Sequence, residues 1–254
     1  MKIKFLGTGG VHGVPVWNCS CDTCTSMNKK NKRLRSSLMV TIGNKNIIID
    51  FGPDFRQQLI KYKIKKIDYA LLTHCHGDHM NDYMELSQQK NVKLLSSKQV
   101  LSEMYKRMGS SKDWLKTRNP SIQIISFREI KVGNTTIAPI KLEHQKDYIK
   151  TPVPCVGFIF QTKNYRFAYL SDYSKILESK KLDNLDLLIS DGNGMKPKHG
   201  HVGVMGSVEV YKNLKPKKML LTHIRHSTEH IDTTKFVKQF GNIEVAYDGL
   251  EIDI

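Results

Sequence analysis

The amino-acid sequence predicts an α/β fold, an αββα sandwich in which two mixed β-sheets are flanked by helices. The first part of the chain is rich in strands, and the end alternates strands with helices. Each half begins with strands and continues with strand–helix units. No linker, low-complexity tract or short repeat separates the two halves. With 254 residues, of which 39% are hydrophobic and 25% charged, we expect one globular domain over residues 1–254.

Short apolar runs ending at polar or glycine-containing turns define the elements of the first half. We expect Asp54 to cap the helix that follows Phe51-Gly52-Pro53, because aspartate is a preferred N-cap residue. A buried strand over 67–73 leads into a cluster of histidines. The predicted elements are strands over 2–7, 38–42, 46–50, 67–73 and 121–126, and helices from Asp54 and over 97–107.

The second half follows the same principles. Its predicted elements are strands over 135–141, 155–160, 165–170, 185–190 and 217–222, helices over 204–214 and 232–240, and a last strand around Ile252.

The balance of 40 basic and 24 acidic residues gives a formal net charge of +16. Such a charge attracts anionic substrates, but the lysines are scattered in runs such as 61–66, as in a lysine-rich proteome. No apolar run approaches the roughly 20 residues of a membrane span, and the N-terminus lacks an apolar signal core. We therefore expect a cytoplasmic protein with no membrane partner and a weak preference for anions.

Three of the five cysteines, Cys19, Cys21 and Cys24, fall within six residues as CxCxxC. An odd number of cysteines with this spacing favours a metal knuckle in a reducing compartment over disulfides. Three thiolates need a fourth ligand to complete tetrahedral zinc. Cys75 lies inside the histidine cluster and Cys155 in a predicted core strand, so a histidine is the better fourth ligand.

The segment HCHGDH at residues 74–79 places four metal-competent side chains directly after a buried strand. A loop can direct several side chains to one centre, and Gly77 would allow a sharp turn within it. These four side chains cannot complete a pair of metal sites, so other ligands are required. Further candidates stand at predicted strand ends, although each alone is more often an ordinary polar residue. The candidates are His74, His76, Asp78 and His79, and then His144, Asp172 and His223.

This order of residues resembles the metallo-β-lactamase superfamily over almost the whole chain, and Asp50 matches an early aspartate with a supporting role. The resemblance implies two divalent metals, Mn²⁺ or Zn²⁺, with Fe²⁺ also compatible with such ligands. One metal would be held by His74, His76 and His144, the other by Asp78, His79 and His223, with Asp172 bridging both.

An aspartate bridge is typical of the phosphodiesterase members, whereas members that hydrolyse β-lactams often lack it. In such a site two metals about 3.5–4 Å apart lower the pKa of a shared water, and the hydroxide attacks phosphorus in line. We therefore expect a phosphodiesterase in which Asp78 is essential for catalysis.

A closer resemblance is to the PhnP-type phosphoribosyl cyclic phosphodiesterases. It rests on Gly7–Gly10, Gly13-Val14-Pro15, Trp17, the CxCxxC motif, and the segments 221–226 and 248–252. It implies a structural zinc whose fourth ligand is His226, with His12 and His230 as alternatives.

The same resemblance places His201 in the active site, as proton donor or phosphate-oxyanion stabiliser; an exposed loop histidine is the alternative. Gly203, Met205 and Gly206 depart from the relative's pattern, and 95–120 and 145–155 lack obvious counterparts. The phosphoribosyl specificity is thus less secure than the chemistry.

The leading hypothesis is hydrolysis of a small, cyclic, phosphoribosyl-like phosphodiester. One alternative is a nuclease or tRNA-processing phosphodiesterase, which the positive net charge favours. No RNA-binding arm is evident in the sequence, so nucleic acid is the less favoured partner. Another is a PqqB-like cofactor-biosynthesis protein, against which the complete donor set argues. The oligomeric state stays open, a homodimer being one option.

Overall fold

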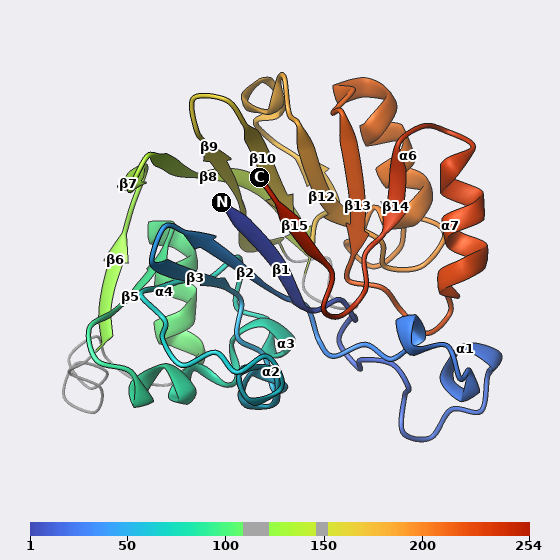
Figure 1. Ribbon diagram of the computed structural model, residues 1–254, viewed down its shortest axis with the longest axis horizontal. Helices are drawn as coiled ribbons and strands as arrows, with labels where there is room; N and C mark the ends of the chain where they lie inside the picture. Colours follow the sequence, from blue (N-terminus) through green and yellow to red (C-terminus); the bar gives the residue numbers. More distant parts are fainter. Residues whose placement is uncertain (109–121, 146–151) are drawn as a thin grey trace.

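The computed structural model describes residues 1–108, 122–145 and 152–254. Its strands form two mixed β-sheets packed face to face, with helices on their outer sides (Figure 1). The predicted fold class is therefore confirmed.

The first sheet has the order β15-β1-β2-β3-β4-β5-β6. Its β15-to-β3 half pairs antiparallel, and its β3-to-β6 half pairs parallel. The strands are β1 (Lys2–Gly7), β2 (Ser37–Ile42), β3 (Lys45–Ile49), β4 (Tyr69–Leu71), β5 (Val92–Ser96), β6 (Ile122–Ser126) and β15 (Glu251–Asp253).

The second sheet has the order β11-β8-β9-β10-β12-β13-β14, and β7 pairs with β8. Pairing is antiparallel up to β10 and parallel from there to β14. The strands are β7 (Ile130–Val132), β8 (Thr135–Gln145), β9 (Pro152–Gln161), β10 (Arg166–Leu170), β11 (Lys175–Ile176), β12 (Leu187–Asp191), β13 (Lys218–Thr222) and β14 (Ile243–Val245).

Helices cover the outer sides, and short 3₁₀ turns connect them. Helices α2 (Phe55–Lys61), α3 (Gly77–Met80) and α4 (Lys98–Arg107) lie on the side of the first sheet (Figure 1). Helices α6 (Gly203–Leu214) and α7 (His230–Lys238) contact β12, β13 and β14 of the second sheet. The remaining helical elements are α1 (Asp22–Thr25) and the 3₁₀ turns Lys29–Asn31, Tyr83–Gln88 and Ser179–Leu182. None of the helices in the described part of the chain is long and apolar enough to cross a membrane.

The parallel strands of the second sheet are apolar on both faces because both faces are covered. In β12, Leu187 and Ile189 belong to the core between the sheets, while Leu188 belongs to the core under the outer helices. In β13, Leu220 faces the first core and Leu221 the second. Side chains alternate along a strand, so this continuous apolar run fills two cores at once.

Most predicted elements are present, with three differences. Strands β7 and β14, three residues each, and the two-residue β11 were not predicted. Asp54 occupies the N-cap position of α2 but makes no capping bond; its carboxylate accepts from the backbone N–H and the guanidinium of Arg35. Residue 121 of the strand predicted over 121–126 lies outside the described residues.

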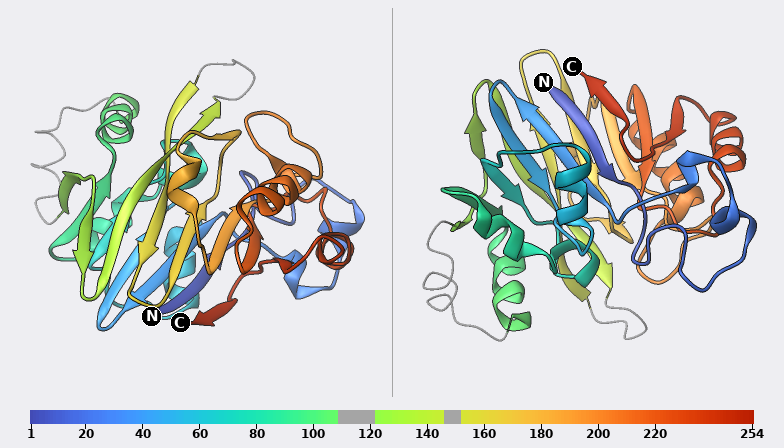
Figure 2. Two further views of the ribbon diagram at one scale, coloured as in Figure 1. Left: turned by 90° about the horizontal axis from the view of Figure 1, so that it is seen from above. Right: turned by 60° about the horizontal axis from the view of Figure 1, so that its bottom comes forward.

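The N-terminal segment between β1 and β2 projects from the sandwich and lies beside α7 (Figures 1 and 2). Polar contacts tie it there. Asn31 donates to the Glu229 carboxylate, and the buried guanidinium of Arg33 bonds Thr8, the carbonyl of Ala246 and Nδ1 of His230. This segment carries the three clustered cysteines and brings them next to the chain that follows β13.

Candidate metal centre

The HCHGDH segment begins three residues after β4 and continues into α3. His76 has an extended backbone at the N-cap of α3, whereas Asp78 and His79 lie in its first turn, so the cluster is borne partly by a helix. Gly77 is not among the residues with positive φ. A Cβ at this position would lie 2.7 Å from Nδ2 of Asn81, so a larger residue would require that side chain to shift.

The structure brings the seven predicted donors together in two groups at one edge of the sandwich. The first group contains three imidazoles, with Nδ1 of His76 3.1 Å from Nε2 of His144. His144 comes from the end of β8, about 70 residues away in the chain from the histidine cluster. The group consists of His74, His76 and His144.

The second group contains two carboxylates and two imidazoles. Nε2 of His79 lies 3.4 Å from Oδ2 of both Asp78 and Asp172. Nε2 of His223 lies 3.3 Å from Asp78 Oδ2 and 3.3 Å from Asp172 Oδ1. All four residues are buried.

Asp172 stands between the two groups. Its Oδ2 is 3.8 Å from Nε2 of His74 and 3.9 Å from Nε2 of His144, both in the first group. The same carboxylate contacts His79 and His223 in the second group. One side chain therefore faces both sets of donors.

Several donors are oriented by a partner on the nitrogen that faces away from the centre. His79 donates from Nδ1 to Oδ2 of Asp50 over 2.7 Å, and Asp50 also accepts from the backbone N–H and hydroxyl of Thr73. His144 donates from Nδ1 to the carbonyl of Gly200 over 2.9 Å. Such bonds fix the tautomer of a ligating histidine and leave Nε2 free to coordinate.

The protonation states of the donors suit a cation. Burial lowers the pKa of His74 well below its usual range and that of His76 to about 4, so both are neutral imidazoles. Burial would raise the pKa of Asp78 and of Asp172, but the neighbouring imidazoles of His79 and His223 hold both well below the usual range. These are the forms that bind metals.

Four buried atoms of the seven proposed ligands have no hydrogen-bond partner: Nε2 of His74, of His76 and of His79, and Oδ1 of Asp172. An unpaired buried polar atom is costly unless another group satisfies it. Burial would lower the pKa of His79, but Asp172, Asp78 and Asp50 raise it well above its usual range, so these carboxylates favour positive charge. The residues present therefore fit bound divalent cations.

His201 adjoins this centre and is not a member of these two groups, but with Asp172, Asp191 and His223 it forms a further group that could hold a metal ion. The centroid of its ring lies 5.1 Å from that of His144 and 5.2 Å from that of His223. Nδ1 of His201 lies 3.4 Å from Oδ1 of the buried Asp191. Burial would lower the pKa of His201, but Asp191 raises it to about 9.

Two residues at this site were not predicted. Asp191, at the end of β12, accepts from the backbone N–H of Gly203 and reaches His201, while the side-chain amide of Asn193 lies 2.9 Å from Nδ1 of His223. Their positions directly after a buried strand, like those of Asp50 and Asp172, are the signal that could have found them.

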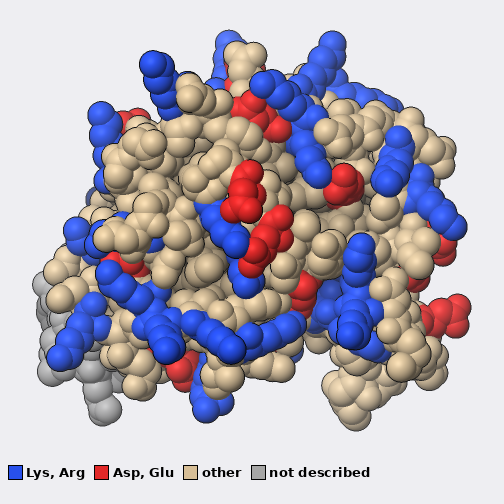
Figure 3. Space-filling view, viewed as in Figure 1, with Lys and Arg blue, Asp and Glu red and all other residues tan. Residues whose placement is uncertain are grey.

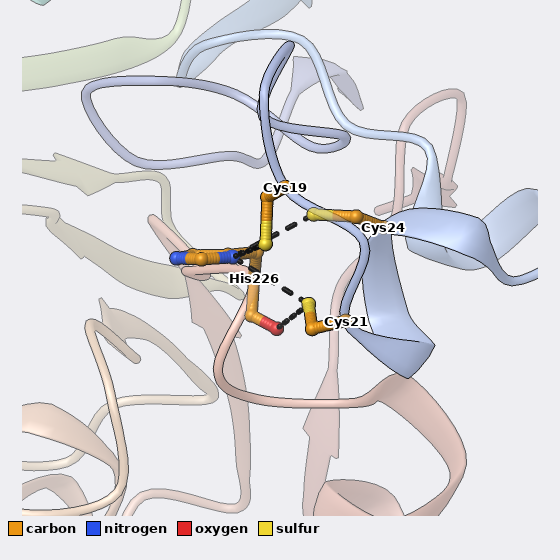
Figure 4. Close-up of side chains that lie close together, drawn as sticks. All are labelled: Cys19, Cys21, Cys24 and His226. Carbon is orange, nitrogen blue, oxygen red and sulfur yellow. Dashed lines mark hydrogen bonds between the residues drawn. The ribbon is translucent and has the colours of Figure 1, made fainter.

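The cysteine knuckle forms a second candidate centre (Figure 4). Nδ1 of His226 lies 3.3 Å from the Sγ atom of Cys19 and 3.6 Å from those of Cys21 and Cys24. A hydrogen bond from the backbone N–H of Cys24 lowers the pKa of Cys21 to about 6, whereas burial raises the pKa of Cys24 to about 11. The four side chains can hold a metal ion.

The other histidines considered for the knuckle lie elsewhere. His230 contacts Arg33, and His12 is exposed. Cys75 and Cys155 are buried, as predicted, at 1% and 5% exposure, and their thiols donate to backbone carbonyls.

The fold and the two clusters define a metal-binding protein of the metallo-β-lactamase type. A family model described as a beta-lactamase superfamily domain matches residues 45–224. The chain therefore belongs to the β-lactamase superfamily.

Known proteins agree with this membership. A crystal structure of a diphosphatase from the PhnP family is 27% identical with a TM-score of 0.86, covering 100% of this chain and 97% of that one. Zn²⁺-bound PqqB from Methylobacterium extorquens shares the fold, with a TM-score of 0.84 at 17% identity and full coverage of both chains. The predicted resemblance to the PhnP family is thus confirmed.

A curated relative, an octanoyltransferase of Porphyromonas gingivalis, is 27% identical over 99% of this chain. The chain spans only about half of that relative, 51% of its length.

Proposed function

We propose that this protein is a binuclear metal-dependent phosphodiesterase that hydrolyses a small, phosphoribosyl-like cyclic phosphodiester. The observation that carries the proposal is the position of Asp172, whose carboxylate lies within 3.3–3.9 Å of imidazole nitrogens in both donor groups. A shared carboxylate with complete donors on both sides matches a pair of cations better than one.

His74, His76 and His144 would hold one cation, Asp78, His79 and His223 the other, and Asp172 both. Bound there, Mn²⁺ or Zn²⁺ would lower the pKa of water and neutralise charge on the phosphoryl oxygens. Asp78 belongs to the machinery as a ligand, and its loss would leave Asp172 as the carboxylate that His79 and His223 still share.

His201 would act beside the cations. With its pKa raised to about 9 by Asp191, it is protonated at neutral pH and able to donate a proton to the leaving alkoxide or a hydrogen bond to a phosphoryl oxygen. Nδ1 of His201 lies 3.4 Å from Asp191, and Nε2, which lies 3.4 Å from the side-chain amide of Asn193, would exchange that contact for the substrate.

We assign a structural zinc to Cys19, Cys21, Cys24 and His226. With Zn–S near 2.3 Å and Zn–N near 2.0–2.1 Å, the S-to-N edge of a tetrahedron is about 3.6 Å. The S-to-N separations of 3.3, 3.6 and 3.6 Å agree with this value. Four protein ligands leave no open position, so this zinc would have no direct part in hydrolysis.

A nuclease of the same fold is the second candidate, and the net charge of +16 favours it. Figure 3 shows Lys and Arg side chains distributed over the visible face rather than concentrated in one track. A dispersed charge attracts anions generally and does not select a polymer. A PqqB-like role is disfavoured by the complete donor set.

The proposal is tested by measuring turnover of the Mn²⁺-loaded and Zn²⁺-loaded protein on a cyclic nucleotide, a linear diester and a structured RNA. We expect the cyclic or small linear diester to be hydrolysed and the RNA to be left intact. Asp78→Ala and His76→Ala should abolish turnover without unfolding the protein, because Asp78 and His76 lie outside the two hydrophobic cores.

Either variant retaining near-normal turnover at saturating metal would rule out the binuclear mechanism. Cleavage of RNA alone would select the nuclease. Circular dichroism of both variants provides the control for folding.

A further inference from the structure

The three sulfur atoms of the cysteine knuckle differ widely in their exposure to solvent. Cys21 is exposed and Cys24 is buried, yet their Sγ atoms lie within 4.8 Å of each other and of Nδ1 of His226 (Figure 4). A thiol that binds a metal does so as a thiolate, and the thiolate is the form that oxidants attack. Cys21 is therefore the point at which an oxidant in solvent can reach the knuckle.

A second thiol stands close enough to Cys21 to form a disulfide with it. Cys24 follows Cys21 by three positions, and its Sγ accepts from the backbone N–H of Val16 over 3.3 Å. Two cysteines with this spacing form the common redox-active CxxC pair, whose S–S bond is about 2.05 Å long. The two thiols outside the knuckle, Cys75 and Cys155, are buried and donate to backbone carbonyls.

A short loop joins the knuckle to the metal centre. His226 follows the proposed ligand His223 by three positions, and between them Ile224 donates to the carbonyl of Thr8 over 2.8 Å and accepts from the N–H of Gly10 over 3.0 Å. His223 itself has a φ of 59°, in the left-handed region that is costly for residues other than glycine. Strand β13 before His223 and the contacts of Ile224 and His226 after it hold the backbone there.

We propose that Cys21 and Cys24 are a site of reversible oxidation, at which a hydroperoxide converts the knuckle into a disulfide and thereby weakens the metal centre through His223. The inference goes beyond the proposed hydrolysis and rests on the structural zinc assigned with it. Both ends of the link are side chains of this chain, so no partner is needed.

One hydroperoxide is consumed for each disulfide, in two steps. Sγ of Cys21 attacks a peroxide oxygen and breaks the O–O bond, which gives a sulfenic acid and, from hydrogen peroxide, a hydroxide. Sγ of Cys24 then attacks the sulfenic sulfur, forms the S–S bond and displaces a second hydroxide. The two sulfurs lose two electrons, the peroxide gains them, and two protons convert the hydroxides to water. Cys19 and His226 alone cannot complete a tetrahedral site, so zinc would leave.

The test uses protein treated briefly with EDTA, so that the zinc it retains is that of the knuckle, and hydrogen peroxide as the oxidant. Peroxide should release about one zinc per chain to a chromophoric chelator, as expected for one four-ligand site. Peptide mapping after alkylation in denaturant should find Cys21 joined to Cys24. Cys75 and Cys155 in the same molecules should stay reduced because they are buried. Dithiothreitol with added Zn²⁺ should reverse both changes.

Two variants identify the thiol that closes the disulfide. In Cys24→Ser the oxidised Cys21 should persist as a sulfenic acid that dimedone traps, whereas Cys155→Ala, which removes a thiol outside the knuckle, should form the disulfide as the wild type does. If Cys24→Ser does not fold, the peptide map of the wild type still decides. A disulfide between Cys19 and Cys21 in the wild type would overturn the assigned pair.

Binding of Mn²⁺ to the metal centre measures the link to His223 without any substrate. In the disulfide form the loop after His223 is freed, so its backbone can leave the left-handed region and must return there to bind metal. Calorimetry should therefore find Mn²⁺ bound about 10-fold more weakly than by the reduced, zinc-loaded protein, the factor that the usual cost of one left-handed residue represents.

Knuckle thiols that stay reduced and keep their zinc at peroxide concentrations that oxidise glutathione would overturn the oxidation site. Equal Mn²⁺ affinity of the reduced and disulfide forms would overturn its link to the metal centre. If no phosphodiester is hydrolysed, the proposed function fails on its own, because zinc release, peptide mapping and Mn²⁺ affinity need no substrate and still decide the redox site.

Discussion

At the scale of single residues, the site is built from side chains with one assigned partner each. His79 is oriented by Asp50 and His144 by the carbonyl of Gly200, and Nδ1 of His201 lies 3.4 Å from Oδ1 of Asp191. These partners lie directly after strands or in tight loops, where backbone position is well determined. Because each imidazole has one nitrogen engaged, the other is free for a cation or a substrate.

His201→Ala should reduce turnover more than metal binding, because His201 is not one of the seven proposed ligands, although it lies in a further group with Asp172, Asp191 and His223. Loss of a proton donor typically costs about 10²–10⁴-fold in rate. A nitrophenolate leaving group needs little protonation, so the loss should be far larger for a diester with a poor alkoxide leaving group. Rates with both substrates provide the measurement. An equal loss would assign His201 to phosphate binding, and no loss would remove it from the mechanism.

A second residue-scale prediction concerns His230, whose Nδ1 lies 3.1 Å from Nη2 of Arg33. Burial and the Arg33 cation lower the pKa of His230 to about 4, against about 6.5 in an unfolded chain. Between these values the unfolded state binds more protons than the folded state. The contribution of His230 to stability is therefore complete above pH 6.5 and lost as the pH falls towards 4.

Denaturant unfolding of His230→Gln and of the wild type between pH 4 and 7 checks this. The variant keeps an acceptor for Arg33 but does not titrate in this range. Acidification should thus cost the wild type about 1–2 kcal/mol more than the variant, after allowance for solvent screening. Parallel pH profiles of the two proteins would show that His230 is not the titrating group.

At the scale of elements, we expect the fold of the knuckle segment to depend on a bound metal. The regular structure of this segment is the four-residue helix α1 (Asp22–Thr25), and little of the segment belongs to the hydrophobic cores. The segment is joined through His226 to the chain that carries His223. A structural zinc would therefore stabilise both the segment between β1 and β2 and the side of the active site that carries His223.

Cys21→Ser should lower zinc content and thermal stability together. Cys21 is exposed, so the substitution itself removes little packing, and the effect should arise from the lost ligand. Zinc per chain by elemental analysis and the Tm are the two readouts, with the exposed neighbour Ser20→Ala as control. Retention of all zinc by Cys21→Ser would show that the knuckle is not a zinc site.

Strand β9 illustrates a different constraint, close packing within the second sheet. A Cβ at Gly157 would lie 2.3 Å from Cδ2 of Leu170 and 2.6 Å from the carbonyl oxygen of Tyr169. Gly157→Ala should therefore destabilise the protein by about 1–3 kcal/mol, as overpacking usually does. Urea denaturation measures this loss, and metal content should be unchanged. A urea midpoint equal to that of the wild type would show that β9 and β10 can move apart without a loss of stability.

At the scale of the whole molecule, two sheets packed face to face bring strand ends from both onto one edge. The first sheet supplies the HCHGDH segment and Asp50, and the second supplies His144, Asp172 and His223. Neither sheet alone holds a complete donor set. Binding of the active-site cations should therefore depend on the packing of the whole sandwich.

Purified protein should contain two classes of metal, a tightly held zinc and a more exchangeable pair. The reason is that thiolates are softer and more selective ligands than mixed nitrogen and oxygen donors. Elemental analysis should find more than two metals per chain, and limited EDTA treatment should remove the pair before the zinc. Simultaneous loss of all metals would contradict the distinction.

The sequence alone determined the features that depend on neighbouring residues. The apolar runs specified most strands, because alternation and β-branched residues act locally. HCHGDH and CxCxxC indicated metal chemistry from their spacing alone. Resemblance then added His144, Asp172, His223 and His226, which no local pattern separates from ordinary strand-end residues.

Only the tertiary structure decided what depends on distant residues. It brought His226 rather than His12 or His230 to the cysteines, about 200 residues away in the chain. It also placed Asp191 beside His201. These contacts join segments whose separation is set by the pairing and packing of whole strands. Their geometry therefore exists only once both cores have formed, and no short stretch of sequence contains it.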